Sequence, residues 1–386
     1  MDLTPTVAPY VASGTIPGLA ALIGHGADEV DAVVLGTAAI DDPRPLTRDA
    51  IFRIASLTKP MVAVAAMVLV DAGVVRLEDP VEELLPELAD RRVLRTIDGP
   101  LDDTVPAQRA ITLEDLLSLR FGFGFSPRFP FPGTTPIQEA EATLELGTLG
   151  PPWPPASIDN TEWMRRLGTL PLLAQPGSTW TYNTGIHVAA VLLERATGAT
   201  LDAVLRDRLF APLGMVDTGF SVPPADVPRL VSFYGADPST GDLQLIDRGD
   251  ASSWWASPPA KLDGSGGLVS TLDDVWSFAR MMACGGRHEG ERLLSAASFD
   301  LLTTDRLTAA QRAASTLFLG EDSGWGLGMA TPLDGIGSFG WDGGTGTSWR
   351  TEPSSGTTAI VLTQRAMGGP QPPEIFRDVW SVAFGR

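Results

Sequence analysis

A helix that is apolar on every side is the feature that most constrains how this chain can fold. Residues 61–73 read MVAVAAMVLVDAG, with a single charged residue near the end. Proline in the first turn and glycine after the last are common start and stop signals of a helix. Because a helix without a polar face does not lie against water, it belongs in a core. We therefore predict a helix over residues 60–72 in the interior of a globular protein of 386 residues.

Ser56 and Lys59 stand at the start of this helix. A serine at a helix N-terminus lies beside unpaired backbone N–H groups and the positive end of the dipole, which favour a developing anion. Lys59, three residues on, shares a helical face with Ser56, and the buried helix draws it inward. Lost hydration lowers the pKa of such a lysine, so that it can accept the serine proton. The alternative is a serine N-cap followed by a lysine that reaches solvent.

Composition excludes several classes of partner and site. Asp and Glu number 47 against 28 Lys and Arg, a net charge of −19, which disfavours nucleic acid and anionic membranes as partners. One cysteine, Cys284, and three histidines cannot build a disulfide framework or a Cys/His metal cluster, so we expect no metal and no cofactor. The N-terminus lacks a signal-peptide pattern and no apolar run reaches membrane-spanning length, so we expect a cytoplasmic protein. The oligomeric state stays open.

Strand patterns lie at both ends of the chain and helix patterns lie between them. Short strands are predicted at 17–24, 30–36, 348–352 and 357–363, and an amphipathic helix at 373–384. The helices predicted in the middle of the chain cover residues 112–119, 185–197, 200–209 and 271–284.

The residues around Ser56 extend the pattern well beyond four positions. Residues 51–60, IFRIASLTKP, resemble the active-site segment of class C β-lactamases, low-molecular-weight penicillin-binding proteins and the related family VIII-type carboxylesterases. Residues 176–185, PGSTWTYNTG, resemble the second signature of that superfamily, a Tyr-x-Asn triplet that enters a helix. The resemblance implies a proton-handling role for Tyr182. Thr184 stands where the family has asparagine, so a shorter hydroxyl replaces the amide that contacts the substrate.

The third signature of the superfamily is best matched by Trp341, Asp342 and Gly343. Glycine at such a place suits close approach of the backbone to a ligand. By resemblance, the backbone N–H of Gly344 joins that of Ser56 in an oxyanion hole. Related β-lactamases place a lysine here to meet the antibiotic carboxylate, whereas this chain has an apolar ring followed by an anion.

The resemblance implies an α/β (α+β) fold. In it, N- and C-terminal strands form an antiparallel sheet flanked by helices, and a mainly helical lobe is inserted. We expect residues 1–75 and 255–386 in the sheet lobe, residues 76–254 in the helical lobe, and the active site between them.

Two aromatic segments, 121–136 and 149–158, are too long and too apolar to be inert linkers. We expect them to border the substrate pocket, with Phe123 and Phe125 among the substrate-binding residues. The same segments hold Phe121, Phe129, Phe131 and Trp153. His187 follows Tyr182 by five residues, and we interpret it as a structural or rim histidine.

These observations predict a serine hydrolase that forms an acyl-enzyme on Ser56, with Lys59 and Tyr182 moving its protons. The expected substrate is a small-molecule ester or amide, and a carboxylesterase for small or medium acyl groups is favoured. Which of Lys59 and Tyr182 is the base stays open, because their protonation states depend on each other. An α/β-hydrolase is disfavoured, since no Gly-x-Ser-x-Gly pentapeptide occurs. The alternatives are an acyltransferase, a β-lactamase, a D-amino-acid amidase or peptidase, and a non-catalytic ligand-binding module.

Overall fold

An eight-stranded antiparallel sheet joins the two ends of the chain in the computed structural model, which describes residues 2–126, 134–147, 155–237, 239–333, 335 and 337–385. The strand order is β12-β13-β14-β15-β16-β1-β2-β3. N-terminal β1 pairs with C-terminal β16, with Leu19 opposite Thr363. The strands of the sheet are β1 Gly18–His25, β2 Asp28–Ala39, β3 Asp42–Pro45, β12 Ser323–Trp325, β13 Ala330–Pro332, β14 Phe339–Gly343, β15 Thr347–Glu352 and β16 Thr357–Thr363. The predicted α/β fold and terminal strands are confirmed.

Both faces of the sheet are covered, and the alternation of side chains along β1 shows how. Successive residues of a strand point to opposite faces. Ala20 and Leu22 enter the large core beneath the helices, whereas Leu19, Ala21 and Ile23 enter a second core on the other face. A strand that is buried on both faces therefore has a continuous apolar sequence.

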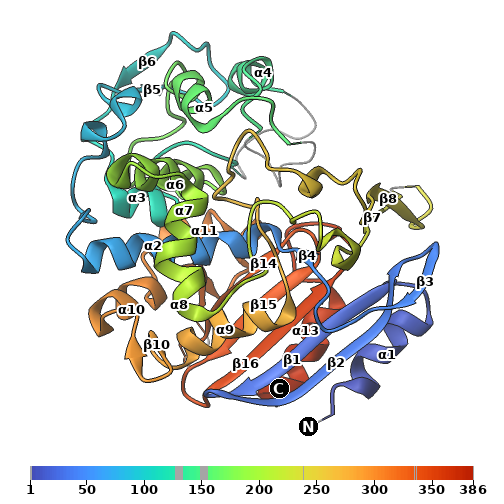
Figure 1. Cartoon of the computed structure of the whole chain (residues 1–386). Helices are drawn as coiled ribbons and strands as arrows, with labels where there is room; N and C mark the ends of the chain where they lie inside the picture. Colours follow the sequence, from blue (N-terminus) through green and yellow to red (C-terminus); the bar gives the residue numbers. More distant parts are fainter. Residues whose placement is uncertain are drawn as a thin grey trace.

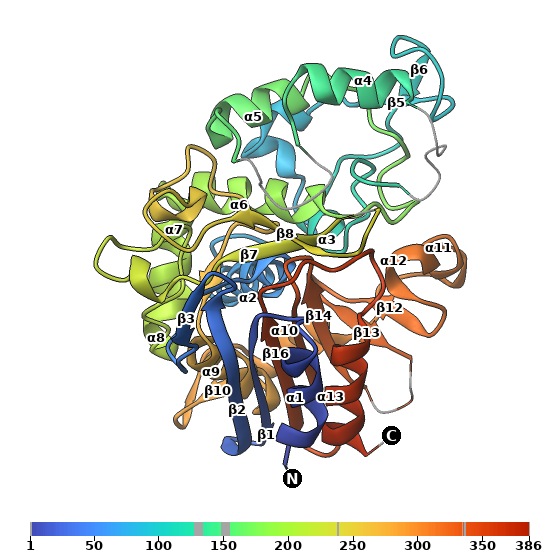
Figure 2. The same cartoon turned by 90° about the vertical axis from the view of Figure 1, so that its right-hand side faces the viewer.

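Two layers of helices cover the sheet (Figure 2). On one face, α1 packs beside α13, and on the other α9 crosses β16 and β1. The helix predicted at 373–384 is confirmed as α13, whereas α1 was not predicted: it is short and holds an internal proline. These helices and their neighbours are α1 Thr4–Ala12, α9 Leu272–Ala283, α10 Ala296–Thr303, α11 Ala309–Ala313, α12 Thr316–Leu319 and α13 Glu374–Phe384.

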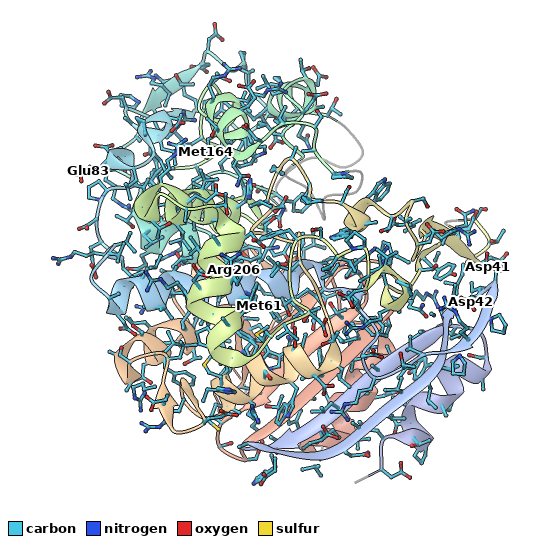
Figure 3. The ribbon with its side chains drawn as sticks, in the orientation of Figure 1. Asp41, Asp42, Met61, Glu83, Met164 and Arg206 are labelled. Carbon is cyan, nitrogen blue, oxygen red and sulfur yellow. The ribbon has the colours of Figure 1, made fainter. Side chains whose placement is uncertain are left out.

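The apolar helix is α2, Thr58–Asp71, and it runs through the middle of the molecule (Figure 1). It contacts α6 and α7 on one side and α10 on the other. Met61 is fully buried within it, whereas Asp41 and Asp42 lie at the outer edge by the β2–β3 turn (Figure 3). The interior helix predicted over residues 60–72 is confirmed.

The middle of the chain forms the helical part above the sheet in Figure 1, and the lobe boundaries at 75 and 254 stay a prediction. Its helices are α3 Leu113–Leu117, α4 Pro136–Thr143, α5 Asn160–Leu167, α6 Thr184–Thr197, α7 Leu201–Leu205 and α8 Ala211–Leu213. Short strands pair as β4 Phe52–Arg53 with β9 Val269–Ser270, β5 Arg92–Leu94 with β6 Thr104–Pro106, β7 Phe233–Ala236 with β8 Leu243–Asp247, and β10 Arg287–His288 with β11 Glu291–Arg292. Within the described ranges, each helix is too short or too polar to cross a membrane.

Candidate active site

Ser56 lies in a tight turn between the sheet and α2. The 3₁₀ turn Ala55–Leu57 leads directly into the helix, and β4 fixes the preceding residues by pairing with β9. Ala55 has a φ of +42°, which is the left-handed region that a residue with a side chain rarely adopts. Such strain is often found next to functional groups. The turn leaves the Ser56 side chain half-buried and lining a pocket.

Lys59 is buried directly behind Ser56, with no exposed surface. Its Nζ lies 2.8 Å from Ser56 Oγ and donates a hydrogen bond of 2.6 Å to the carbonyl oxygen of Ser265. Burial lowers the pKa of Lys59 to about 7, and the negative charge of Asp263 opposes this shift. The lysine therefore exchanges its proton near neutral pH.

Tyr182 approaches Ser56 from the segment that precedes α6. Its hydroxyl donates a hydrogen bond of 3.0 Å to Ser56 Oγ and accepts one of 2.9 Å from Trp341 Nε1. The ring centroid lies 4.6 Å from Lys59 Nζ. Burial raises the pKa of Tyr182 to about 12, although its bonds to Ser56 and Trp341 oppose the shift. The fold thus brings together Ser56, Lys59 and Tyr182, which the sequence motifs singled out.

Strand β14 passes next to the turn that holds Ser56, and glycine permits this approach. A Cβ atom on Gly343 would lie 2.3 Å from the carbonyl oxygen of Ile54, so a larger residue would push the strand away. Gly344, the next residue, lines the same pocket as Ser56. Its carbonyl accepts a hydrogen bond of 2.9 Å from Met367 N, which anchors this loop. The oxyanion role of Gly344 stays a prediction.

A cavity of about 420 Å³ opens over Ser56 and is mostly apolar. Trp341 and Phe125 line it, as the sequence predicts. Asp342 also lines it, but its carboxylate accepts hydrogen bonds from Ser348 Oγ (2.7 Å) and Arg350 Nη2 (2.9 Å). The anion expected at this position therefore forms an ion pair with Arg350, which compensates its charge inside the protein. The lining residues are Ser56, Phe125, Tyr182, Asn183, Leu317, Phe318, Trp341, Asp342, Gly344, Ala366, Met367, Gly369 and Pro370.

Three residues predicted to bind substrate, Phe123, Thr184 and Gly343, do not line this cavity. Phe123 is only 1% exposed and belongs to the core, because the chain turns at Gly122 and Gly124, both with positive φ. Thr184 is likewise buried at the start of α6, and its hydroxyl has no hydrogen-bond partner among the described residues. Asn183, one position earlier, faces the cavity instead. Phe129, Phe131 and Trp153 lie outside the described residues.

His187 is a buried structural residue rather than a rim residue. Its Nδ1 accepts a hydrogen bond of 3.2 Å from Gly264 N, and its ring meets Trp163 edge-on with centroids 4.4 Å apart. Burial lowers the pKa of His187 to about 3, so the ring is neutral. Ser265, which holds Lys59, was missed because the glycine-rich run 264–267 has the composition of an ordinary turn.

Comparisons with known proteins give likenesses along nearly the whole chain. The sequence profile of the family described as Beta-lactamase matches residues 3–384. Protein Rv1367c of Mycobacterium tuberculosis is 35% identical over 367 residues, covering 91% of this chain and 86% of that protein. Esterase EstB of Burkholderia gladioli is 28% identical over 356 residues, covering 86% of this chain and 82% of the esterase. A solved structure, "EstCE1, a hydrolase with promiscuous acyltransferase activity", superimposes with a TM-score of 0.79 at 24% identity, covering 98% of this chain and 97% of the other.

Proposed function

The chain belongs to the beta-lactamase family, and from this premise we propose that it is a serine esterase that forms an acyl-enzyme on Ser56. One observation carries the proposal: Lys59 Nζ and the Tyr182 hydroxyl both lie within hydrogen-bond distance of Ser56 Oγ. A nucleophile in contact with a base is the arrangement that covalent catalysis requires. The similarity to an esterase at 28% identity favours esters as the substrate class.

Lys59 is the proposed general base. A neutral amine has two N–H groups and one lone pair, and Ser265 O accepts from one of those N–H groups. The lone pair can then receive the Ser56 proton across 2.8 Å. Because burial disfavours the ammonium form, the amine carries its lone pair in a large share of molecules at neutral pH.

Tyr182 is the proposed proton donor to the leaving group. Its raised pKa keeps the hydroxyl protonated while Lys59 titrates, so the two groups divide the acid and base roles. The oxyanion of the tetrahedral intermediate would be held by the backbone N–H groups of Ser56 and Gly344. Water would then attack the acyl-enzyme and give a proton to the Tyr182 oxygen, and the Lys59 ammonium would return its proton to Ser56 Oγ as the acid leaves.

The lining of the cavity favours uncharged acyl groups. Its walls are formed largely by Phe125, Leu317, Phe318, Trp341 and Met367. Within the described residues, neither Lys nor Arg lines it, so a substrate carboxylate would find no cation there. An apolar cavity with a few convergent polar groups suits a small or medium ester.

The pH dependence of ester hydrolysis should report the titration of Lys59. We expect kcat/KM to rise with pH through a single ionisation near 7 and then to stay level, because only the neutral amine accepts a proton. Tyr182 should cause no decline below about pH 10, since burial holds its pKa higher. Initial rates with p-nitrophenyl butyrate between pH 5 and 10 would test this. A profile that falls as pH rises through 7 would contradict the base role of Lys59.

Esters should be hydrolysed in preference to cephalosporins. We expect kcat/KM for p-nitrophenyl acetate and butyrate to exceed that for nitrocefin by roughly 10-fold to 100-fold, because one charge-assisted bond to the antibiotic carboxylate is missing. Both substrate types would be measured in one buffer, with the Ser56→Ala variant as the blank for spontaneous hydrolysis. A nitrocefin value equal to the ester values would make a β-lactamase the better proposal.

A further inference from the structure

Lysine occurs only at positions 59 and 261 of this chain, and both side chains are buried. Lys261 is 5% exposed, and its Nζ lies 3.0 Å from the carboxylate of Asp263 and 5.3 Å from the ring of Trp163. Arginine carries the other basic charges, and it stays protonated where lysine can lose its proton. Both lysines of the chain are therefore held inside the protein.

Asp263 organises the turn that holds Lys59. One of its carboxylate oxygens accepts hydrogen bonds from Ser265 N (2.8 Å) and Ser265 Oγ (2.6 Å). Its backbone carbonyl accepts another from Gly267 N at 2.8 Å. The turn closes so that Ser265 O faces Lys59 Nζ at 2.6 Å. Three bonds from one residue thus fix the position of the carbonyl that orients the amine.

The carboxylate of Asp263 is buried inside the protein. Its side chain is 4% exposed and lies 3.8 Å from His187 Nδ1. His187 accepts a hydrogen bond from Gly264 N there, and the neutral ring adds no charge. The charged or titratable groups around Asp263 are thus Lys261, His187 and Lys59, and the Tyr182 ring centroid lies 4.6 Å from Lys59 Nζ.

We propose that Asp263 is a positioning residue for Lys59: it fixes the Ser265 carbonyl against the amine and supplies a buried negative charge behind it. The proposal rests on the function proposed above for Ser56 and Lys59. Asp263 does not line the substrate cavity, so it acts on the proton transfer and not on substrate binding. Loss of the charge should favour the neutral amine further, because a nearby anion stabilises the ammonium form.

The two lysines allow a direct test by NMR. Labelling with ¹³Cε-lysine gives two side-chain signals, and the Lys59→Met variant assigns them. In Asp263→Asn, we expect the titration midpoint of Lys59 to move to lower pH by about one unit, because the opposing charge is lost. The rise of kcat/KM with pH should likewise move to lower pH. A misplaced Ser265 carbonyl should also lower kcat roughly 10-fold to 100-fold while KM is unchanged.

Asp263→Asn leaves the charge of Lys261 buried without its partner, which can by itself disturb folding. A second variant therefore removes both charges. Lys261→Met/Asp263→Asn removes both charges and leaves Lys59 as the single lysine signal, and its midpoint should also lie below that of the wild type. Asp115→Asn is the matched control. Asp115 is also buried, pairs with Arg109 and accepts a hydrogen bond of 3.0 Å from Thr112 N. The Asp115→Asn change should lower stability without moving the titration midpoint of Lys59.

The outcomes separate this proposal from the proposed function. A Lys59 midpoint that is the same in Asp263→Asn, in the double variant and in the wild type would overturn the role of Asp263, even if Ser56 is the nucleophile. Turnover that persists in Ser56→Ala would overturn the proposed function instead. The titration midpoint of Lys59 is measured without turnover. It therefore tests the effect of Asp263 whether or not Ser56 is the nucleophile.

Discussion

Replacement of Ser56 by alanine is expected to abolish ester hydrolysis and to leave the fold intact. Lys59 and Tyr182 both direct their polar atoms at the oxygen that this change removes. Turnover should fall by about four to six powers of ten, as happens when a serine nucleophile is removed. The half-buried side chain loses one atom, so the cavity left behind is small. Steady-state rates with p-nitrophenyl butyrate and thermal unfolding by circular dichroism would measure both effects.

A serine outside the site provides the control for this variant. Ser355 is also half-buried, and its hydroxyl bonds to the carbonyl of Glu352 within the β15–β16 turn. Ser355→Ala should keep full activity. Labelling with a fluorophosphonate, followed by peptide mass spectrometry, should modify Ser56 in the wild type and leave the Ser56→Ala variant unmodified. A folded Ser56→Ala protein with more than roughly a hundredth of wild-type turnover would place the nucleophile elsewhere.

The central part of the site could be predicted because it is encoded locally. Ser56 and Lys59 are three residues apart on a helix whose burial follows from its composition, so their proximity needs no tertiary information. Tyr182 is far away in the sequence, and only the resemblance of its flanking residues to a known signature linked it to Ser56. The terminal strands were predictable for the same local reason, since β1 and β16 are short apolar runs.

The walls of the pocket could not be predicted in the same way. Alternating glycine and phenylalanine at 121–125 indicate an aromatic surface, but the backbone angles at Gly122 and Gly124 decide which ring points inward. Phe123 is buried in the core and Phe125 lines the cavity, a difference that composition does not encode. The pairing of Asp342 with Arg350 joins neighbouring strands and depends on their register.

Loss of either proton-handling group should lower kcat strongly, and loss of both should cost little more. We expect Lys59→Met and Tyr182→Phe each to reduce kcat by about a hundredfold to ten-thousandfold, the usual range for a general acid or base. Their polar atoms converge on Ser56 Oγ at 2.8 and 3.0 Å, so each variant disrupts the same acylation step, in which one group takes up the Ser56 proton and the other supplies a proton to the leaving group. Values of kcat for the wild type, the two single variants and the double variant complete a double-mutant cycle.

The tyrosine change has a matched control that separates a lost catalytic group from a lost buried hydroxyl. Tyr182→Phe leaves Trp341 Nε1 without its acceptor. Tyr234→Phe leaves Ile40 N without its acceptor in the same way, since that N–H donates to the Tyr234 hydroxyl at 2.9 Å. Tyr182→Phe should destabilise the protein by about 1–3 kcal/mol, the cost of an unpaired buried donor, and Tyr234→Phe should cost less, because Ile40 is 59% exposed. Only Tyr182→Phe should lower kcat.

The size of the combined effect decides whether Lys59 and Tyr182 act as one unit. If both groups are needed in the same acylation step, either single change already disables that step, and the double variant should resemble the slower single variant. A double variant slowed by the full product of the two single effects would mean that each group acts in a separate step. The division of roles inferred from the lowered pKa of Lys59 and the raised pKa of Tyr182 would then describe two independent proton transfers rather than one coupled site.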